Sequence, residues 1–153
     1  MAVKSSELYR FLPMRIDDLN MVHNLEVDSY QFPWTKEIIR DCILYNYDSY
    51  SVFFGDKIIG YIISKISYPE THILNLTVNS KFRNNGIGTS LIQLIIDDAR
   101  IRNSKDIILE VRTSNASAQS LYKKLSFEII GLRKDYYECK EGREDALVLK
   151  LEL

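Results

Sequence analysis

The spacing of apolar residues changes twice along this chain, and that change most limits the folds it can adopt. Three segments have the alternating or continuous apolar pattern of strands, Tyr50–Phe54, Ile58–Ile66 and His72–Val78. From Gly86 to Arg102 apolar residues recur at helical spacing, and a buried-strand run, Ile107-Ile108-Leu109, follows. Strands joined through a crossover helix lie parallel, so the sequence predicts a parallel pair at its centre.

The flanking segments complete the expected order of elements. A short strand, Tyr9–Met14, precedes a helix from about Ile16, and Thr35 is a plausible N-cap for a second helix with Ile38, Ile39, Cys42 and Ile43 on its apolar face. A further helix, Asn115–Leu125, and two strands, Phe127–Tyr137 and Ala146–Leu151, close the chain. We expect an α+β fold with a mixed sheet of about seven strands and about four helices, forming one domain over residues 1–153.

Composition excludes several classes of protein. The 20 Lys and Arg balance 21 Asp and Glu, a formal net charge of −1, which argues against binding nucleic acid or a membrane by bulk charge. No apolar run approaches the ~20 residues of a membrane span, and residues 1–10 lack the pattern of a signal peptide. We expect a cytoplasmic protein. Its oligomeric state stays open.

Histidine and cysteine are scarce. Only His23, His72, Cys42 and Cys139 occur, without metal-ligand spacing, so we expect no metal and interpret both histidines as structural. We interpret Cys42 as a core residue and Cys139 as a loop thiol, which disfavours a covalent intermediate on cysteine. The sequence leaves a bridge between the two cysteines open.

The turn Arg83-Asn84-Asn85-Gly86-Ile87-Gly88 lies between a strand and a helix. Its glycines let backbone approach a ligand, and a helix N-terminus offers free N–H groups to an anion. The turn lacks the Gly-Lys-Ser/Thr ending of a P-loop, and Leu91 stands where a Rossmann fingerprint needs a third small residue. A tight turn without any ligand is the alternative.

The pattern Arg-x-x-Gly-x-Gly after Leu76-Thr77-Val78 resembles the signature of the GCN5-related N-acetyltransferases, the GNAT superfamily. Leu109-Glu110-Val111-Arg112-x-Ser114-Asn115, followed by Leu121-Tyr122 and Phe127, resembles the peptide N-terminal acetyltransferases within it. Phe32-Pro33-Trp34, Arg133–Tyr137 and Gly142–Ala146 narrow the resemblance to the bacterial RimI type. Two positions depart from the family pattern, because Thr77 stands in place of alanine and Ser126 in place of glycine.

The resemblance implies acetyl transfer from acetyl-CoA, without a metal, to a protein N-terminus in a ternary complex. The family substrate is the N-terminal alanine of the eighteenth small-subunit ribosomal protein. Glu110 is then the general base, directly or through a water, and Tyr122 protonates the leaving thiolate. The implied acetyl-CoA contacts are Leu76, Thr77, Val78, Arg83, Asn84, Asn85, Gly86, Ile87, Gly88, Thr89 and Asn115. The implied peptide contacts are Phe32, Pro33, Trp34, Tyr136 and Tyr137.

Each of these residues also has a plain structural interpretation. Glu110 lies two positions from Arg112 on one strand face, where the two side chains would pair. Tyr122 lies on an apolar helix face, as core aromatics do, and Asn115 is a natural helix cap. Tyr136 and Tyr137 should alternate faces on a strand, leaving one in the core and one exposed.

Two other functions stay open. One is a GNAT enzyme acting on another N-terminus, a lysine side chain or a small amine. The other is a CoA-binding module without catalysis.

Overall fold

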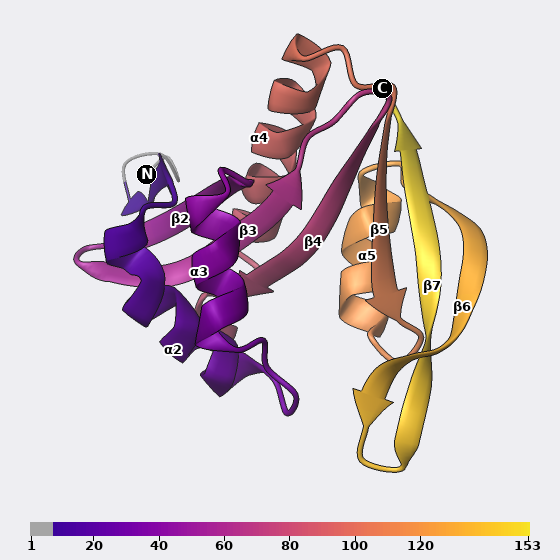
Figure 1. The fold of residues 1–153 in the computed structure, drawn as a ribbon, viewed down its shortest axis with the longest axis horizontal. Coiled ribbons are helices and arrows are strands. Elements are labelled where there is room, and N and C mark those ends of the chain that lie inside the picture. The colour runs from indigo at the N-terminus through magenta and orange to yellow at the C-terminus, as the bar shows by residue number, and fades with distance from the viewer. Residues whose placement is uncertain (1–7) are drawn as a thin grey trace. The chain divides into compact units, whose positions relative to one another are not determined.

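The strands expected from the sequence join into one mixed sheet. The structure, a computed structural model, describes residues 8–153. Seven strands follow the order β1-β2-β3-β4-β5-β7-β6 (Figure 1). β4 and β5 pair in parallel, whereas β1–β2, β2–β3, β5–β7 and β6–β7 are antiparallel pairs. The predicted α+β class, with parallel strands on either side of the central crossover helix, is confirmed.

The elements have the following bounds. The strands are β1 Arg10–Pro13, β2 Asp48–Phe54, β3 Lys57–Lys65, β4 Glu70–Val78, β5 Asp106–Arg112, β6 Glu128–Cys139 and β7 Gly142–Glu152. The helices are α2 Leu19–Ser29, α3 Lys36–Leu44, α4 Ile87–Ile101 and α5 Ala116–Lys124, with single 3₁₀ turns at Ile16–Asp18 and Ser80–Phe82. The helix expected from Ile16 therefore begins as a 3₁₀ turn and becomes α-helical at Leu19.

Contacts divide the chain into two compact units. In the described residues, unit one comprises 8–64 and 75–95, and unit two comprises 65–74 and 96–153. The domain boundary expected at residues 1–153 stays a prediction, and the two units are described in turn.

Unit one is built on the hairpin of β2 and β3. Its turn contains Gly55 at φ +60°, a left-handed backbone that glycine adopts without steric cost. Ile58–Ser64 is buried throughout, because the continuous apolar run expected of a two-sided strand is covered on both faces. The N-cap prediction is confirmed, since the Thr35 hydroxyl accepts the Ile38 N–H at 3.3 Å. Ile38 itself is exposed, so its placement on the apolar face of α3 was wrong.

Gly60 on β3 allows this strand to lie close to the end of β4 and the start of α4, two parts of the expected site. A Cβ built on this residue would lie 3.1 Å from the carbonyl oxygen of Thr77 and 3.5 Å from Ile87. Thr77 near the end of β4 and Ile87 at the start of α4 both belong to unit one, as Gly60 does. A side chain here would push β4 away from β3.

In unit two, β5 pairs with the start of β4 on one side and with β7 on the other. Ile107, Leu109 and Val111 are buried, so the core side of β5 is the odd-numbered one and Glu110 lies on the other face. In Figure 1, α5 lies beside β5 and β7. The register pairs His72 with Ile108, two residues before Glu110.

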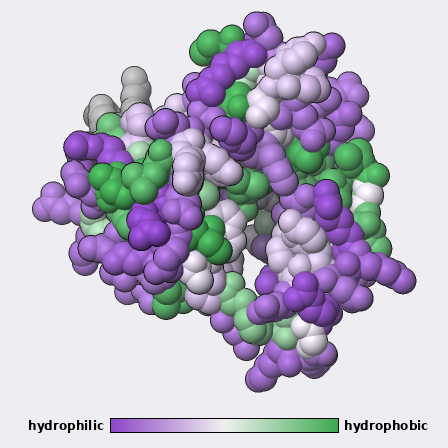
Figure 2. Space-filling model, viewed as in Figure 1, coloured by the Kyte–Doolittle hydropathy of each residue, from purple (hydrophilic) through white to green (hydrophobic). Residues whose placement is uncertain are grey.

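The edge strand β6 is irregular, and this overturns the expected alternation of its side chains. Its register against β7 shifts between Ile129 and Gly131 and again between Arg133 and Tyr137. Asp135 has φ +51° within the second irregularity. Apolar surface gathers over β6 at the right of Figure 2, where the exposed apolar residues of this strand are Ile129, Ile130 and Leu132.

Two further expectations concern membranes and thiols. Within residues 8–153, no helix combines the length and apolar character needed to cross a bilayer. Cys42 and Cys139 are both free. Cys42 is a core residue as expected, whereas Cys139 ends β6 instead of lying in a loop.

Candidate active site

The predicted site residues fall in both units. Unit one contains the predicted acetyl-CoA contacts of β4 and the glycine turn, together with Phe32, Pro33 and Trp34. Unit two contains Glu110, Asn115, Tyr122, Tyr136 and Tyr137.

The glycine turn forms an exposed loop ahead of α4. Asn84 and Gly86 have φ of +64° and +76°, and a Cβ on Gly86 would meet nothing within 4 Å. The side chain of Asn85 donates to the carbonyls of Phe82 at 3.0 Å and Arg83 at 3.2 Å, which fixes the loop.

The loop leaves backbone donors at the start of α4. The first N–H groups of a helix, here Ile87, Gly88 and Thr89, have no acceptor inside it. Together with the helix dipole of α4, a 15-residue helix, they suit an anion such as a pyrophosphate. The turn therefore suits the anionic diphosphate of the acetyl-CoA that the resemblance implies.

The end of β4 is tied to α2 by a tyrosine. The Tyr30 hydroxyl donates to the Leu76 carbonyl at 3.1 Å and lies 2.8 Å from the hydroxyl of Thr77. Thr77, buried here, donates in turn to the Asn75 side chain at 3.0 Å. The hydroxyl that replaces the family's alanine is thus used in a polar network, and the carbonyl of Leu76 already has a partner.

Glu26 is a buried carboxylate that the sequence analysis missed. One of its oxygens accepts the Tyr61 hydroxyl at 2.5 Å and the Asn75 amide at 2.7 Å, and the other accepts the Trp34 N–H at 3.3 Å. Burial, and then the neighbouring carboxylate of Glu26, raise the pKa of Tyr61 far above its usual value, so its hydroxyl remains a donor. The network joins α2, β3 and β4 to the segment Phe32–Trp34.

A signal for Glu26 was present in the sequence. It lies one turn after Val22 and beside Leu25, which form the buried face of α2. A carboxylate on that face requires hydrogen-bond donors in the interior, because burying a charge without them is costly.

Glu110 has two partners, and neither is the Arg112 expected from their spacing. Its Oε2 lies 2.6 Å from Nε2 of His72 on β4, and its Oε1 lies 3.3 Å from Nε of Arg133 on β6. Burial would raise the pKa of Glu110, but the hydrogen bond and charge of His72, with the charge of Arg133, outweigh burial and lower it. His72, interpreted from the sequence as a structural residue, therefore belongs to this cluster.

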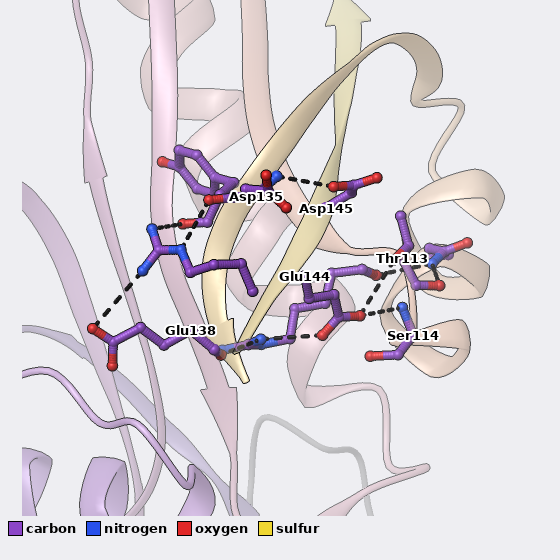
Figure 3. A network of polar contacts seen from close by, with 10 residues as sticks. Thr113, Ser114, Asp135, Glu138, Glu144 and Asp145 are labelled. Carbon is purple, nitrogen blue, oxygen red and sulfur yellow. Dashed lines mark hydrogen bonds and ion pairs between the residues drawn. The ribbon is translucent and has the colours of Figure 1, made fainter. Parts of the chain in front are cut away.

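Arg112 instead reaches the β6–β7 hairpin. Its Nη1 donates to the Glu138 carbonyl at 2.8 Å and to Glu144 at 3.1 Å. Figure 3 shows Glu144 directed toward Thr113 and Ser114, whose backbone N–H it accepts at 2.8 Å. Hydrogen bonding by Ser114, chiefly from its side chain and less from its backbone, lowers the pKa of Glu144.

This contact holds the turn that leads to Asn115. The Asn115 side chain accepts the Ala118 N–H at 3.1 Å, so the capping interpretation is confirmed. Asn115 remains exposed, and a cap leaves its amide nitrogen available to a ligand.

Tyr136 and Tyr137 were expected on opposite faces of a strand, and this was wrong. Their rings are in edge-to-face contact with centroids 4.8 Å apart, because the irregularity after Arg133 breaks the alternation. The guanidinium of Arg112 lies 4.5 Å from the ring centroid of Tyr137, and that of Arg133 lies 5.7 Å from that of Tyr136. The two tyrosines thus form one aromatic cluster beside the Glu110 group.

Tyr122 is buried on α5, and its ring packs edge-to-face on Phe127 at 5.6 Å. Ser126, which precedes Phe127, has φ +72°, the left-handed conformation that glycine adopts most easily at a helix end. The serine keeps the helix exit but carries the steric strain of a Cβ there.

Comparison with known proteins gives the chain a family. A profile of the Acetyltransferase (GNAT) family matches residues 19–127. The [ribosomal protein bS18]-alanine N-acetyltransferases of Escherichia coli K12 and Haemophilus ducreyi are 29% and 31% identical, covering 88% and 89% of this chain and 90% and 94% of their own.

A solved structure has the same fold. The ribosomal-protein-S18-alanine N-acetyltransferase from Escherichia coli superposes with a TM-score of 0.87 at 27% identity, covering 94% of this chain and 93% of that one. The family profile and these relatives point to the same family, and the free helix N-terminus after the glycine turn is consistent with it. The chain belongs to the acetyltransferase (GNAT) family and is an N-acetyltransferase that uses acetyl-CoA.

Proposed function

We propose that this enzyme acetylates the N-terminal α-amino group of a protein, and that its substrate is the N-terminal alanine of the eighteenth small-subunit ribosomal protein. The observation that carries the proposal is the similarity, over most of both chains, to relatives named for that reaction. The carboxylate cluster supports it, because an α-ammonium of pKa about 8 must lose a proton before it attacks.

The proposed roles follow the chemistry of direct transfer. The amine nitrogen attacks the thioester carbonyl, the C–S bond breaks and the CoA thiolate leaves. Glu110 acts as the general base for the amine proton, directly or through a water, and Tyr122 donates a proton to the thiolate. A phenol of pKa ~10 protonates a thiolate of pKa ~8.5 only from close by, so this role depends on placement.

The binding roles use backbone as well as side chains. Backbone of Leu76, Thr77 and Val78 binds pantetheine and polarises the thioester. The turn from Arg83 through Thr89 (Arg83, Asn84, Asn85, Gly86, Ile87, Gly88, Thr89) holds the pyrophosphate, and Asn115 provides a further contact to CoA. Phe32, Pro33 and Trp34, with Tyr136 and Tyr137, contact the peptide. Exposure of Phe32 and Tyr136, at 40% and 42%, supports a contact role for both.

A peptide series tests the substrate. Three peptides are compared for acetyl-CoA-dependent thiol release: one beginning Ala-Arg, one beginning Met, and one with a blocked N-terminus and an internal lysine. We expect the Ala-Arg peptide to react fastest. Equal turnover on the lysine peptide would refute N-terminal specificity and favour a lysine or small-amine acetyltransferase.

The variant Glu110→Gln tests the base. It keeps the size of the side chain, so we expect kcat to fall by about 100-fold with acetyl-CoA affinity unchanged. Full turnover at neutral pH would remove Glu110 from proton transfer. Glu138→Gln, which changes an exposed carboxylate near the end of β6, is the matched control.

A further inference from the structure

His72 and Glu110 form the shortest contact of the carboxylate cluster. The parallel register sets His72 opposite Ile108, and Glu110 stands two residues further along the same face of β5. The Nε2–Oε2 distance of 2.6 Å is that of a charge-assisted hydrogen bond. β4 and β5 are paired here by backbone hydrogen bonds within unit two, and this pairing holds the His72 and Glu110 side chains near each other.

The imidazole is more accessible than the carboxylate it contacts. The side chain of Glu110 is 6% exposed, and that of His72 is 31% exposed. Arg133 occupies the other oxygen of Glu110. Tyr136 is the third charged or titratable neighbour of Glu110. Burial raises the pKa of its phenol, and the nearby carboxylate of Glu110 raises it further. An incoming amine therefore meets more open surface on the ring than on the carboxylate.

The hydrogen bond also decides which ring nitrogen is basic. An ionised carboxylate only accepts, so it holds the proton of a neutral imidazole on Nε2. The lone pair then lies on Nδ1, on the far side of the ring from Glu110. This is the arrangement of a base oriented by a carboxylate.

The energetics favour an imidazole over a carboxylate as the acceptor. Transfer from an α-ammonium to an ordinary imidazole is unfavourable by about 30-fold, and to an ordinary glutamate by about 5,000-fold. The hydrogen bond from His72 and the charge of Arg133, which act against burial to lower the pKa of Glu110, widen that difference.

We propose that Nδ1 of His72 takes the proton from the acceptor amine, while Glu110 orients the ring and stabilises the imidazolium. The amine N–H bond breaks and an Nδ1–H bond forms. The Nε2–H stays on the ring, and the new proton later passes to water. The inference rests on the proposed function, in which Glu110 acts directly or through a water, and it puts His72 in the place of that water.

The variant His72→Gln separates a base from a structural partner. The Gln amide still donates a hydrogen bond to Glu110 but accepts no proton at neutral pH. We expect kcat to fall by about 100-fold with acetyl-CoA KM unchanged. His23→Gln, at the other histidine of the chain, is the control and should keep wild-type kcat. Added imidazole should restore part of the turnover of His72→Ala and none of that of Glu110→Gln.

A measurement on the wild-type enzyme does not depend on any variant folding. Long-range ¹H–¹⁵N NMR reports which nitrogen of a neutral histidine carries the proton. We expect His72 to be protonated on Nε2. A ring protonated on Nδ1 would overturn the proposal, because no lone pair would then be available to the amine.

The outcomes distinguish this inference from the substrate proposal. If the wild type acetylates an amine other than the Ala-Arg peptide, the substrate proposal fails, and the His72 variants are measured on that amine. If His72→Gln keeps kcat within about threefold of wild type while Glu110→Gln loses about 100-fold, Glu110 is itself the acceptor and the inference is wrong.

Discussion

The hydrogen bond from Tyr61 to Glu26 should be among the most stabilising side-chain contacts of unit one. Tyr61→Phe removes one hydroxyl from a residue that is 0% exposed and leaves the ring in place. Within residues 8–153, Glu26, 2% exposed, then keeps the Asn75 amide and the Trp34 N–H as its donors. Water does not reach this carboxylate easily, so the lost donor is not replaced.

The magnitude follows from the charge of the acceptor. A hydrogen bond to a charged group contributes about 1.5–3 kcal/mol, more than a neutral one. For a chain of this size each kcal/mol lowers Tm by about 2–4 °C, so we expect a fall of roughly 3–12 °C. Urea unfolding of both proteins at neutral pH, with equal m-values, gives the difference in free energy.

A matched substitution controls for the loss of a tyrosine hydroxyl as such. Tyr45 is 71% exposed, and Tyr45→Phe should change the free energy of unfolding by less than about 0.5 kcal/mol. If Tyr61→Phe were as mild as Tyr45→Phe, the buried network of Glu26 would not be a source of stability for unit one.

Three further outcomes are expected. Ser126→Gly should raise the free energy of unfolding by about 0.5–1 kcal/mol, because glycine relieves the positive φ, whereas Ser126→Ala should not; chemical denaturation measures both. Glu144→Gln should weaken the turn held through Ser114, lowering stability by about 1 kcal/mol and raising the KM for acetyl-CoA, with Glu138→Gln as the neutral control. Tyr122→Phe should keep the fold, since the ring packing remains, and lower kcat by about 100-fold; unchanged kcat would exclude the phenol as the acid.

The order of elements was predictable because periodicity reports which faces are buried. The parallel pair, the Thr35 cap and the Asn115 cap all follow from local pattern, and the structure confirms them. Local pattern also placed Glu110 in a strand with a buried face. It did not reveal the partners of Glu110, because His72 and Arg133 lie on two other strands, β4 and β6.

The errors have the same origin. Spacing along one strand suggested an ion pair of Glu110 with Arg112, but the hairpin offers Arg112 a carboxylate, Glu144, and a carbonyl. The faces of Tyr136 and Tyr137 were mistaken because a register irregularity is a property of two strands together. Glu26 was missed for a further reason: its donors come from β3, β4 and the segment after α2.

The central claim is acetyl transfer to a protein N-terminus, and mass spectrometry tests it most directly. The enzyme is incubated with acetyl-CoA and a peptide that begins with alanine and contains one internal lysine, and fragmentation locates the product. We predict a single acetyl group on the α-amino nitrogen, formed far more slowly by Glu110→Gln. Acetylation of the lysine side chain, or equal product from both enzymes, would contradict the account.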